Sequence, residues 1–290
     1  MTVAQEMHKI QHKLIIKGGG YLVLPEWVVD SGLANLSIPD EADLSQQAQY
    51  QNYPIGAKLA KNDCIYRYSR IGETIAVGHE GFLKCNRLIC PGKAGNSLHS
   101  GYEGGAYAAI VAAQTYFDIT DTAAYKNEYE NGTLCIYDYG TSPAYIDRYK
   151  VIGNDVSNGT YTRCYIASPG FQRAIATSGV TFDLYNNPYY SVGSLLTADN
   201  QSWKSALGMF PRAPLTSGYF IWLQTADPCH GTGASTWPGQ TARQREVMAN
   251  TDGSLIGITA ATYLYQRVGY LLSGTAIDYG DVFFMLQLDQ

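Results

Sequence analysis

The amino-acid sequence predicts an all-β protein: a β-sandwich or barrel domain, or more than one, with short strands preceded by an extended N-terminal arm. Three observations predict this class. Short runs that alternate large and polar residues recur from Tyr53 onwards, which is the pattern of half-buried strands. Gly, Asn-Gly and Asp-Gly turn signals separate these runs by about 8–12 residues, as in sandwiches and barrels. No apolar run approaches the ~18 residues that a membrane-spanning helix needs.

Residues 1–50 differ from the rest and are expected to form the arm. The first 17 residues are polar, Gly18–Gly20 interrupts regular structure, and residues 37–51 are acidic and rich in Gln. A short strand at residues 21–24 ends at a proline. Such a segment lacks a core of its own and is usually ordered by docking onto another surface. The candidate interface residues are its large apolar side chains and the first one that follows: Tyr21, Leu22, Trp27, Tyr50 and Tyr53.

Residues 51–290 form the predicted β-rich part, either as one domain or as two subdomains that divide near residue 200. Residues 125–132 have the composition of a helical turn that ends at Asn-Gly, and Asp252-Gly253 is a compact hairpin signal. We find no internal repeat of fixed period. The clearest strand patterns lie at residues 64–69, 82–85, 107–120, 133–138, 145–152, 160–166, 174–184, 218–225, 243–249, 266–272 and 281–288.

Low charge and abundant tyrosine are the main compositional features. Charged residues make up 16% of the chain, against about 25% in an ordinary globular domain. The 24 Tyr outnumber the 20 Lys and Arg together. Tyrosine suits a surface that another protein covers, although the strand preference of Tyr accounts for about half of the surplus. A net charge of −5 argues against nucleic acid as a partner, and we expect no membrane partner either.

Candidate catalytic and metal-ligating residues are few, and the sequence predicts a non-enzymatic protein without cofactor or metal. His8 and His12 are four residues apart and would face one side of a helix, as metal ligands can. No third ligand is near them, and Gly18 would end the helix. Ser97 and His99 are near neighbours, but they lack the GxSxG turn of a hydrolase. We expect them to be polar loop residues.

The most enzyme-like segment is Asp227-Pro228-Cys229-His230, since a Cys–His pair can form a nucleophilic thiolate. Adjacent residues of an extended chain point to opposite faces, so we expect no catalytic pair there. His79 and Glu80 are expected to be loop residues. A glycosidase would need two carboxylates on either side of a sugar. No pair stands out among the available aspartates, Asp118, Asp121, Asp138, Asp147 and Asp183.

Six cysteines occur, and none forms a CxxC pair. Cys85 and Cys90 are spaced as CxxxxC, which is a poor zinc signature. We expect reduced thiols that pack as small apolar groups, with disulfides or a metal as the alternatives. The first 17 residues lack the apolar segment of a secretory signal. The absence of such a signal leads us to expect a protein made in a cytoplasm.

Two segments resemble virion structural proteins encoded by environmental tailed phages. Tyr-Pro-Ile-Gly at residues 53–56, followed by Asp63 and Tyr68, is similar to their Y-P-x-G-x₆-D-x₄-Y segment. Residues 217–225, Ser-Gly-Tyr-Phe-Ile-Trp-Leu-Gln-Thr, resemble their later Y-x-F/I-W-L-Q-T strand. The order and separation of the two segments are also similar. The resemblance runs from about residue 50 to the C-terminus and supplies no catalytic residues.

The resemblance implies a virion protein, and we expect a capsid decoration (cement) protein located on the capsid surface. Its partners would be the major capsid protein and its own copies, in a symmetric oligomer with a trimer favoured. In this hypothesis the β domain covers subunit junctions and residues 1–50 act as a clamp. The alternatives are the capsid shell subunit itself, a β-rich hydrolase, or a carbohydrate- or receptor-binding β module that would use Trp203, Trp222 and Trp237 as sugar platforms.

Overall fold

The structure is a computed structural model, and it is nearly all β, with 49% strand and 3% helix. The all-β prediction is therefore confirmed. Among the described residues no helix is long and apolar enough to cross a membrane. The structure describes residues 13–17, 20–24, 39–74, 87–91, 101–140, 145–194, 205–210, 215–240, 244–250, 253–258, 266–273 and 281–289.

The chain forms two compact units. The main unit combines Met1–Lys93 with Pro188–Gln290, and the inserted unit is Ala94–Asn187. The sequence left open a division near residue 200. The structure places one boundary between Asn187 and Pro188 and another, which the sequence did not indicate, between Lys93 and Ala94. The second unit is therefore an insertion into the first.

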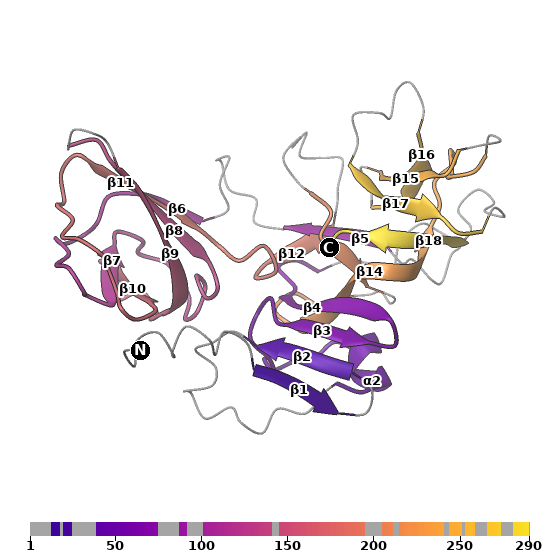
Figure 1. Cartoon of the computed structure of the whole chain (residues 1–290), viewed down its shortest axis with the longest axis horizontal. Coiled ribbons are helices and arrows are strands. Elements are labelled where there is room, and N and C mark those ends of the chain that lie inside the picture. Colours follow the sequence, from indigo (N-terminus) through magenta and orange to yellow (C-terminus); the bar gives the residue numbers. More distant parts are fainter. Residues whose placement is uncertain are drawn as a thin grey trace, which may run out of the picture. The chain divides into compact units, whose positions relative to one another are not determined.

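The main unit contains a 12-stranded antiparallel sheet whose centre is the long strand β14 (Phe220–Thr232). β14 pairs with β4 on one side and with β18 on the other, and its first half is almost wholly buried, as its apolar sequence requires. Figure 1 shows β1 to β4 in indigo and purple, with β4 beside β14. The order is β1 (Lys13–Lys17), β2 (Gly20–Leu24), β3 (Lys58–Lys61), β4 (Cys64–Arg70), β14, β18 (Asp281–Gln287), β17 (Arg267–Leu271), β15 (Glu246–Ala249) and β16 (Leu255–Gly257), with β5 (Arg87–Pro91), β12 (Val192–Ser194) and β13 (Gly208–Phe210) off this path.

The described parts of residues 1–50 belong to this sheet and its core. β1 and β2 form a hairpin, and β2 pairs with β3 from Tyr21 to Val23. The short helix α2 (Glu41–Ser45) buries Leu44 in the same apolar cluster as Leu22. The sequence predicted that this stretch docks onto another surface. In its described parts, that surface is the sheet of the same chain.

The inserted unit is a six-stranded antiparallel sheet that curls into a barrel-like shape (Figure 1). The chain just after β6 bridges to β7 at Ala106 and Ile119, and the Tyr107 amide donates to the Asp118 carbonyl at 2.7 Å. These contacts join the two ends of the strand order and close the sheet. The order is β6 (Gly101–Gly104), β11 (Val180–Tyr185), β8 (Thr133–Asp138), β9 (Tyr145–Asn154), β10 (Thr162–Ile166) and β7 (Tyr116–Ile119).

Alternation along the strands fills the barrel. In β10, Thr162, Cys164 and Ile166 are buried, while the residues between them are half-buried. Phe117 from β7 and Phe182 from β11 meet edge to face inside, with ring centroids 5.9 Å apart. All the described residues of this core belong to the inserted unit. The inserted unit therefore has the apolar interior that an independent domain requires.

The first and last strands of the inserted unit are neighbours. β6 and β11 pair antiparallel, and the register places Gly101 opposite Tyr185. Paired residues of an antiparallel ladder have Cα atoms only about 4.5–5.5 Å apart. The first and the last described strand of the inserted unit therefore have their outer ends, Gly101 and Tyr185, side by side.

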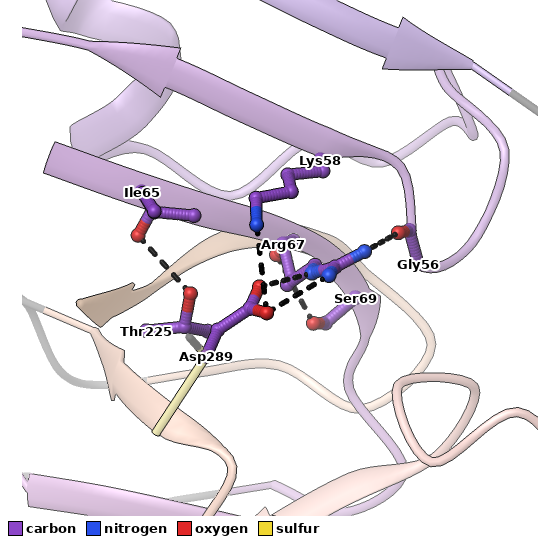
Figure 2. A network of polar contacts seen from close by, with 7 residues as sticks. All are labelled: Gly56, Lys58, Ile65, Arg67, Ser69, Thr225 and Asp289. Carbon is purple, nitrogen blue, oxygen red and sulfur yellow. Dashed lines mark hydrogen bonds and ion pairs between the residues drawn. The ribbon is translucent and has the colours of Figure 1, made fainter. Parts of the chain in front are cut away.

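A network of charged groups fixes the C-terminal end of the main unit (Figure 2). The Asp289 carboxylate accepts hydrogen bonds from Nε and Nη2 of Arg67 at 2.6 and 3.1 Å, and Nζ of Lys58 lies 3.6 Å away. Arg67 also donates to the carbonyl of Gly56 at 3.1 Å. The Asp289 amide donates to the carbonyl of Thr225 on β14 at 3.2 Å. The chain end is thereby attached to the β3–β4 hairpin.

The four cysteines with described side chains are free thiols, as expected: Cys64, Cys135, Cys164 and Cys229. The last three are buried, where they pack as small apolar groups. Burial raises the pKa of Cys229 to about 12 and also raises the pKa of Cys164. Both thiols therefore stay protonated near neutral pH. Cys85 lies outside the described residues.

Candidate interaction surface

The outer face of β7 and β10 gathers four tyrosines around one ion pair. Because Thr162, Cys164 and Ile166 of β10 face the core, the alternate residues face outwards. The register places Arg163 opposite Asp118 and Tyr165 opposite Tyr116, so that these pairs share a face. We call this the tyrosine–arginine surface: Tyr107, Tyr116, Asp118, Tyr161, Arg163 and Tyr165.

The ion pair of this surface is bidentate. Nε and Nη2 of Arg163 donate to the two carboxylate oxygens of Asp118 at 2.8 and 3.0 Å. This bidentate geometry fixes the plane of the guanidinium. The guanidinium carbon lies 4.4 Å from the ring centroid of Tyr116, which is a cation–π contact. The hydrogen bond to Asp118 raises the pKa of Arg163, so its charge is permanent.

The surrounding tyrosines are also held in place. The rings of Tyr107 and Tyr161 stack with centroids 4.8 Å apart. The Tyr165 hydroxyl donates to Asp155 at 2.7 Å, a hydrogen bond that raises the Tyr165 pKa to about 12. Tyr107 and Tyr116 nevertheless remain 46% and 38% exposed. The surface thus presents ordered aromatic rings to solvent.

Rings and guanidinium groups of this kind are typical of protein–protein hot spots, where Tyr, Trp and Arg dominate the binding energy. An aromatic side chain offers about 150–250 Å² of surface, so the exposed parts of Tyr107 and Tyr116 each leave roughly 70–100 Å² to cover. At about 25 cal/mol per Å², covering one such ring contributes about 2 kcal/mol. Because the groups are already ordered, little conformational entropy is lost on binding.

The inserted unit carries most of the exposed large apolar side chains of the described residues, although it is the smaller unit. Those of the main unit are Tyr21, Tyr50 and Leu272. Those of the inserted unit are Tyr107, Val111, Tyr116, Tyr125, Tyr139, Tyr145, Ile146 and Val156.

The interface residues chosen from the sequence lie elsewhere. Leu22 and Tyr53 are buried in the core of the main unit, so the chain itself covers the side chains that were expected to meet a partner. The reason is that the apolar residues of this stretch pack on their own sheet. Tyr21 and Tyr50 are exposed, and their interface role stays a prediction. Trp27 lies outside the described residues.

The enzyme-like segment behaves as its extended conformation predicts. On β14, Cys229 is buried and His230 is exposed, so the two side chains lie on opposite faces. The His230 ring packs against Phe283, with ring centroids 4.6 Å apart. A buried thiol whose pKa is raised is a poor nucleophile. The segment therefore offers no Cys–His pair.

The aspartates are engaged in structural contacts. Asp118 binds Arg163, and Asp138 and Asp147 both accept from Arg173, at 2.6 and 2.9 Å. Asp121 accepts from the Tyr129 hydroxyl, and Asp183 also has a partner. Within the described ranges no three His, Cys, Asp or Glu side chains are placed to hold a metal. His8, His12, His79, Glu80, Ser97, His99 and Trp203 lie outside those ranges.

The two segments that carry the phage resemblance are adjacent in the main sheet. β4 pairs with β14, with Tyr68 opposite Trp222. The rings of Tyr53, Tyr68 and Trp222 lie 5.0–5.2 Å apart, in a cluster that also includes Phe220. The conspicuous aromatics of both segments therefore build the core. No protein-family model, curated protein or solved structure matches this chain.

Proposed function

We propose that this chain is a structural protein of a tailed-phage virion, a capsid decoration protein that stabilises the shell through protein–protein contacts. The virion context is supported by the resemblance of residues 53–68 and 217–225 to phage structural proteins. The docking role is supported by the tyrosine–arginine surface, which carries the proposal. It combines exposed aromatic rings and a guanidinium in a preorganised arrangement.

The proposed partners are the major capsid protein and further copies of this chain, in a symmetric oligomer for which a trimer is favoured. Synthesis would take place in the host cytoplasm, and the protein would act on the capsid surface without a cofactor or enzymatic activity. Repeated copies on a lattice turn modest individual contacts into high avidity. Since β1, β2 and α2 belong to the main unit, we assign the docking to the inserted unit and not to a clamp formed by residues 1–50.

The experiment is co-sedimentation of the purified chain with capsids of the virus that encodes it. Replacing Tyr107 and Tyr116 by Ser removes about 2 kcal/mol of apolar contact for each covered ring, so the double substitution should weaken binding at least about 100-fold. Tyr125→Ser is the matched control, because Tyr125 is 71% exposed on the same unit but lies outside the surface. Equal binding of both variants and the wild type would remove the surface from the proposal. Failure of the wild type to bind would refute the decoration role.

The alternative virion role is the shell subunit. Shell proteins of tailed phages usually carry a long spine helix, whereas α2, with five residues, is the longest helix in the described part of the chain. Electron microscopy of the purified protein separates the two roles. A shell subunit would assemble alone into closed particles, and a decoration protein would not.

A further inference from the structure

A second outward face of the barrel lies on β6, β11, β8 and β9, four strands that do not carry the tyrosine–arginine surface (Figure 1). Leu134 and Ile136 of β8 belong to the core, as does Phe182 of β11. Because side chains alternate along a strand, the residues between them face outwards, and so do their direct partners on the neighbouring strands. We call this the four-strand face, defined by Glu103, Tyr137, Ile146, Arg148, Thr181 and Asp183.

Positive and negative charges are separated across this face. The register places Glu103 of β6 opposite Asp183 of β11, and Arg148 lies in the same row, two strands further along on β9. Lys150 is two residues after Arg148 and therefore on the same side of β9. The face thus has an acidic edge on β6 and β11 and a basic edge on β9.

The two edges are too far apart to neutralise each other within one copy. Glu103 and Arg148 are separated by three strand spacings of about 4.8 Å, roughly 14 Å in all, which exceeds the screening length of about 8 Å at physiological salt. Both side chains are exposed, and among the described residues neither has an ion-pair partner. Like charges directly opposite each other, such as Glu103 and Asp183, destabilise a sheet. A partner that brings cations to the acidic edge and carboxylates to the basic edge is therefore favoured.

A row of larger side chains adjoins the charged row. Thr181, Tyr137 and Ile146 are direct neighbours on β11, β8 and β9. Ile146 is 64% exposed, and Tyr139, which is 69% exposed, stacks on Tyr137 with ring centroids 6.4 Å apart. Gly105 directly follows β6 at the other end of this row, and beyond its chain neighbours no atom lies within 4 Å of a Cβ added there. The row therefore has a bulky apolar end and an open end.

We propose that the four-strand face binds the same face of a second copy, about a two-fold axis that runs parallel to the strands between β11 and β8. This axis exchanges the two edges, so that Glu103 faces the partner's Arg148 and the open space at Gly105 faces the partner's Ile146. An axis across the strands would instead place carboxylate on carboxylate. The occupant is a second copy because the charges and shape of the face are complementary to themselves. Such an isologous contact is closed and gives a dimer.

The size of the face determines the strength of the dimer. Four strands of about six residues cover roughly 19 by 20 Å, so two copies together bury on the order of 800 Å², within the range of weak and transient interfaces. We therefore expect a Kd of about 100 µM. The contact is independent of capsid docking, which uses β7 and β10. It predicts a dimer of the free chain, whereas a trimer is favoured for the oligomer on the capsid.

Charge reversal in the full chain tests this contact by sedimentation equilibrium. Glu103→Arg places two arginines opposite each other in both symmetric contacts, and Arg148→Glu does the same with two carboxylates. Each variant should therefore dimerise at least about tenfold more weakly than the wild type. A mixture of the two variants restores opposite charges in both contacts and should form a 1:1 heterodimer about as tight as the wild-type dimer. Lys126→Glu is the matched control, since Lys126 is exposed on the same unit but outside the face.

Thermal unfolding checks that every variant is folded. Ile146→Ser provides a test that changes no charge, and it should also weaken the dimer, because a 64% exposed apolar side chain would lose its cover. The proposal is overturned if the wild type is monomeric at about 1 mM, ten times the expected Kd, or if it forms a trimer. It is also overturned if the charge-reversed variants dimerise as the wild type does, if their mixture does not associate, or if Lys126→Glu weakens the dimer equally.

Discussion

Replacing Asp289 by Asn tests how much the C-terminal network of Figure 2 stabilises the main unit. The Asp289 carboxylate is 14% exposed, and it accepts two hydrogen bonds from the Arg67 guanidinium. Asparagine keeps the shape and one acceptor oxygen but loses the charge. Arg67 then lacks its counter-ion in a partly buried position, as does Lys58, which lies 3.6 Å from the carboxylate.

The expected loss is about 2 kcal/mol of unfolding free energy at pH 7, since a hydrogen bond to a charged partner contributes about 1.5–3 kcal/mol and Asn retains part of it. For a unit of this size, about 1 kcal/mol corresponds to 2–4 °C, so the Tm should fall by roughly 4–8 °C. Urea unfolding followed by tryptophan fluorescence measures the free energy. Asp63→Asn is the control, because Asp63 is exposed in the β3–β4 turn and should change stability by less than about 0.5 kcal/mol.

The difference between wild type and Asp289→Asn should also depend on pH. Burial alone would raise the pKa of Asp289, but the hydrogen bond and charge of Arg67 and the charge of Lys58 outweigh it and leave the pKa below its usual value. A depressed carboxyl pKa stabilises the folded state above the unfolded-state pKa of about 3.9, and this contribution is lost as the pH falls through the folded-state pKa. The stability difference should therefore be complete at neutral pH and narrow in acid. A difference equal to that of Asp63→Asn, or one that does not change in acid, would refute the reasoning.

A glycine substitution and a thiol-labelling experiment test the packing of the two cores. Gly269→Ala should lower the free energy of unfolding in urea by at least about 1–3 kcal/mol, because the added Cβ would lie 1.8 Å from the Met285 carbonyl oxygen of the neighbouring strand. Gly105→Ala is the control, since beyond its chain neighbours no atom lies within 4 Å of the added Cβ. Equal unfolding midpoints for the two variants would contradict the expected clash. Iodoacetamide at neutral pH should leave Cys164 and Cys229 unmodified in the native protein and label both in urea, as read by peptide mass spectrometry, since burial keeps these thiols protonated. Native labelling at the rate of the unfolded chain would show that these thiols are accessible.

The sequence predicted the strands well where local alternation decides them. Residues 64–69 lie in β4 and residues 133–138 are β8, and residues 220–225 of the apolar run at 218–225 form the buried first half of β14. The sequence did not predict that the second unit is an insertion. The insertion depends on the pairing of Gly101 with Tyr185, and no local sequence pattern encodes that pairing. Leu22 shows the same limit: its apolar character does not say whether another protein or its own sheet covers it.

The sequence alone indicates only some residues of the tyrosine–arginine surface. The alternation in residues 160–166 already places Tyr161, Arg163 and Tyr165 on the face opposite Thr162, and this signal could have nominated them. From the sequence alone, Asp118 is a candidate only for a pair of catalytic carboxylates. Its role as the partner of Arg163 follows from the pairing of β7 with β10, which needs the three-dimensional structure.

Because Gly101 and Tyr185 are adjacent, the inserted barrel is a module that can be exchanged. A module whose two ends meet can be removed and replaced by a tight loop, because the host fold has only a narrow gap to bridge. The described core residues of the barrel and of the main unit belong to separate clusters, so substitutions on the outward face of the barrel leave the interior of the main unit unchanged. For the same reason the barrel can be inserted into a loop of another protein, with a short linker at each end.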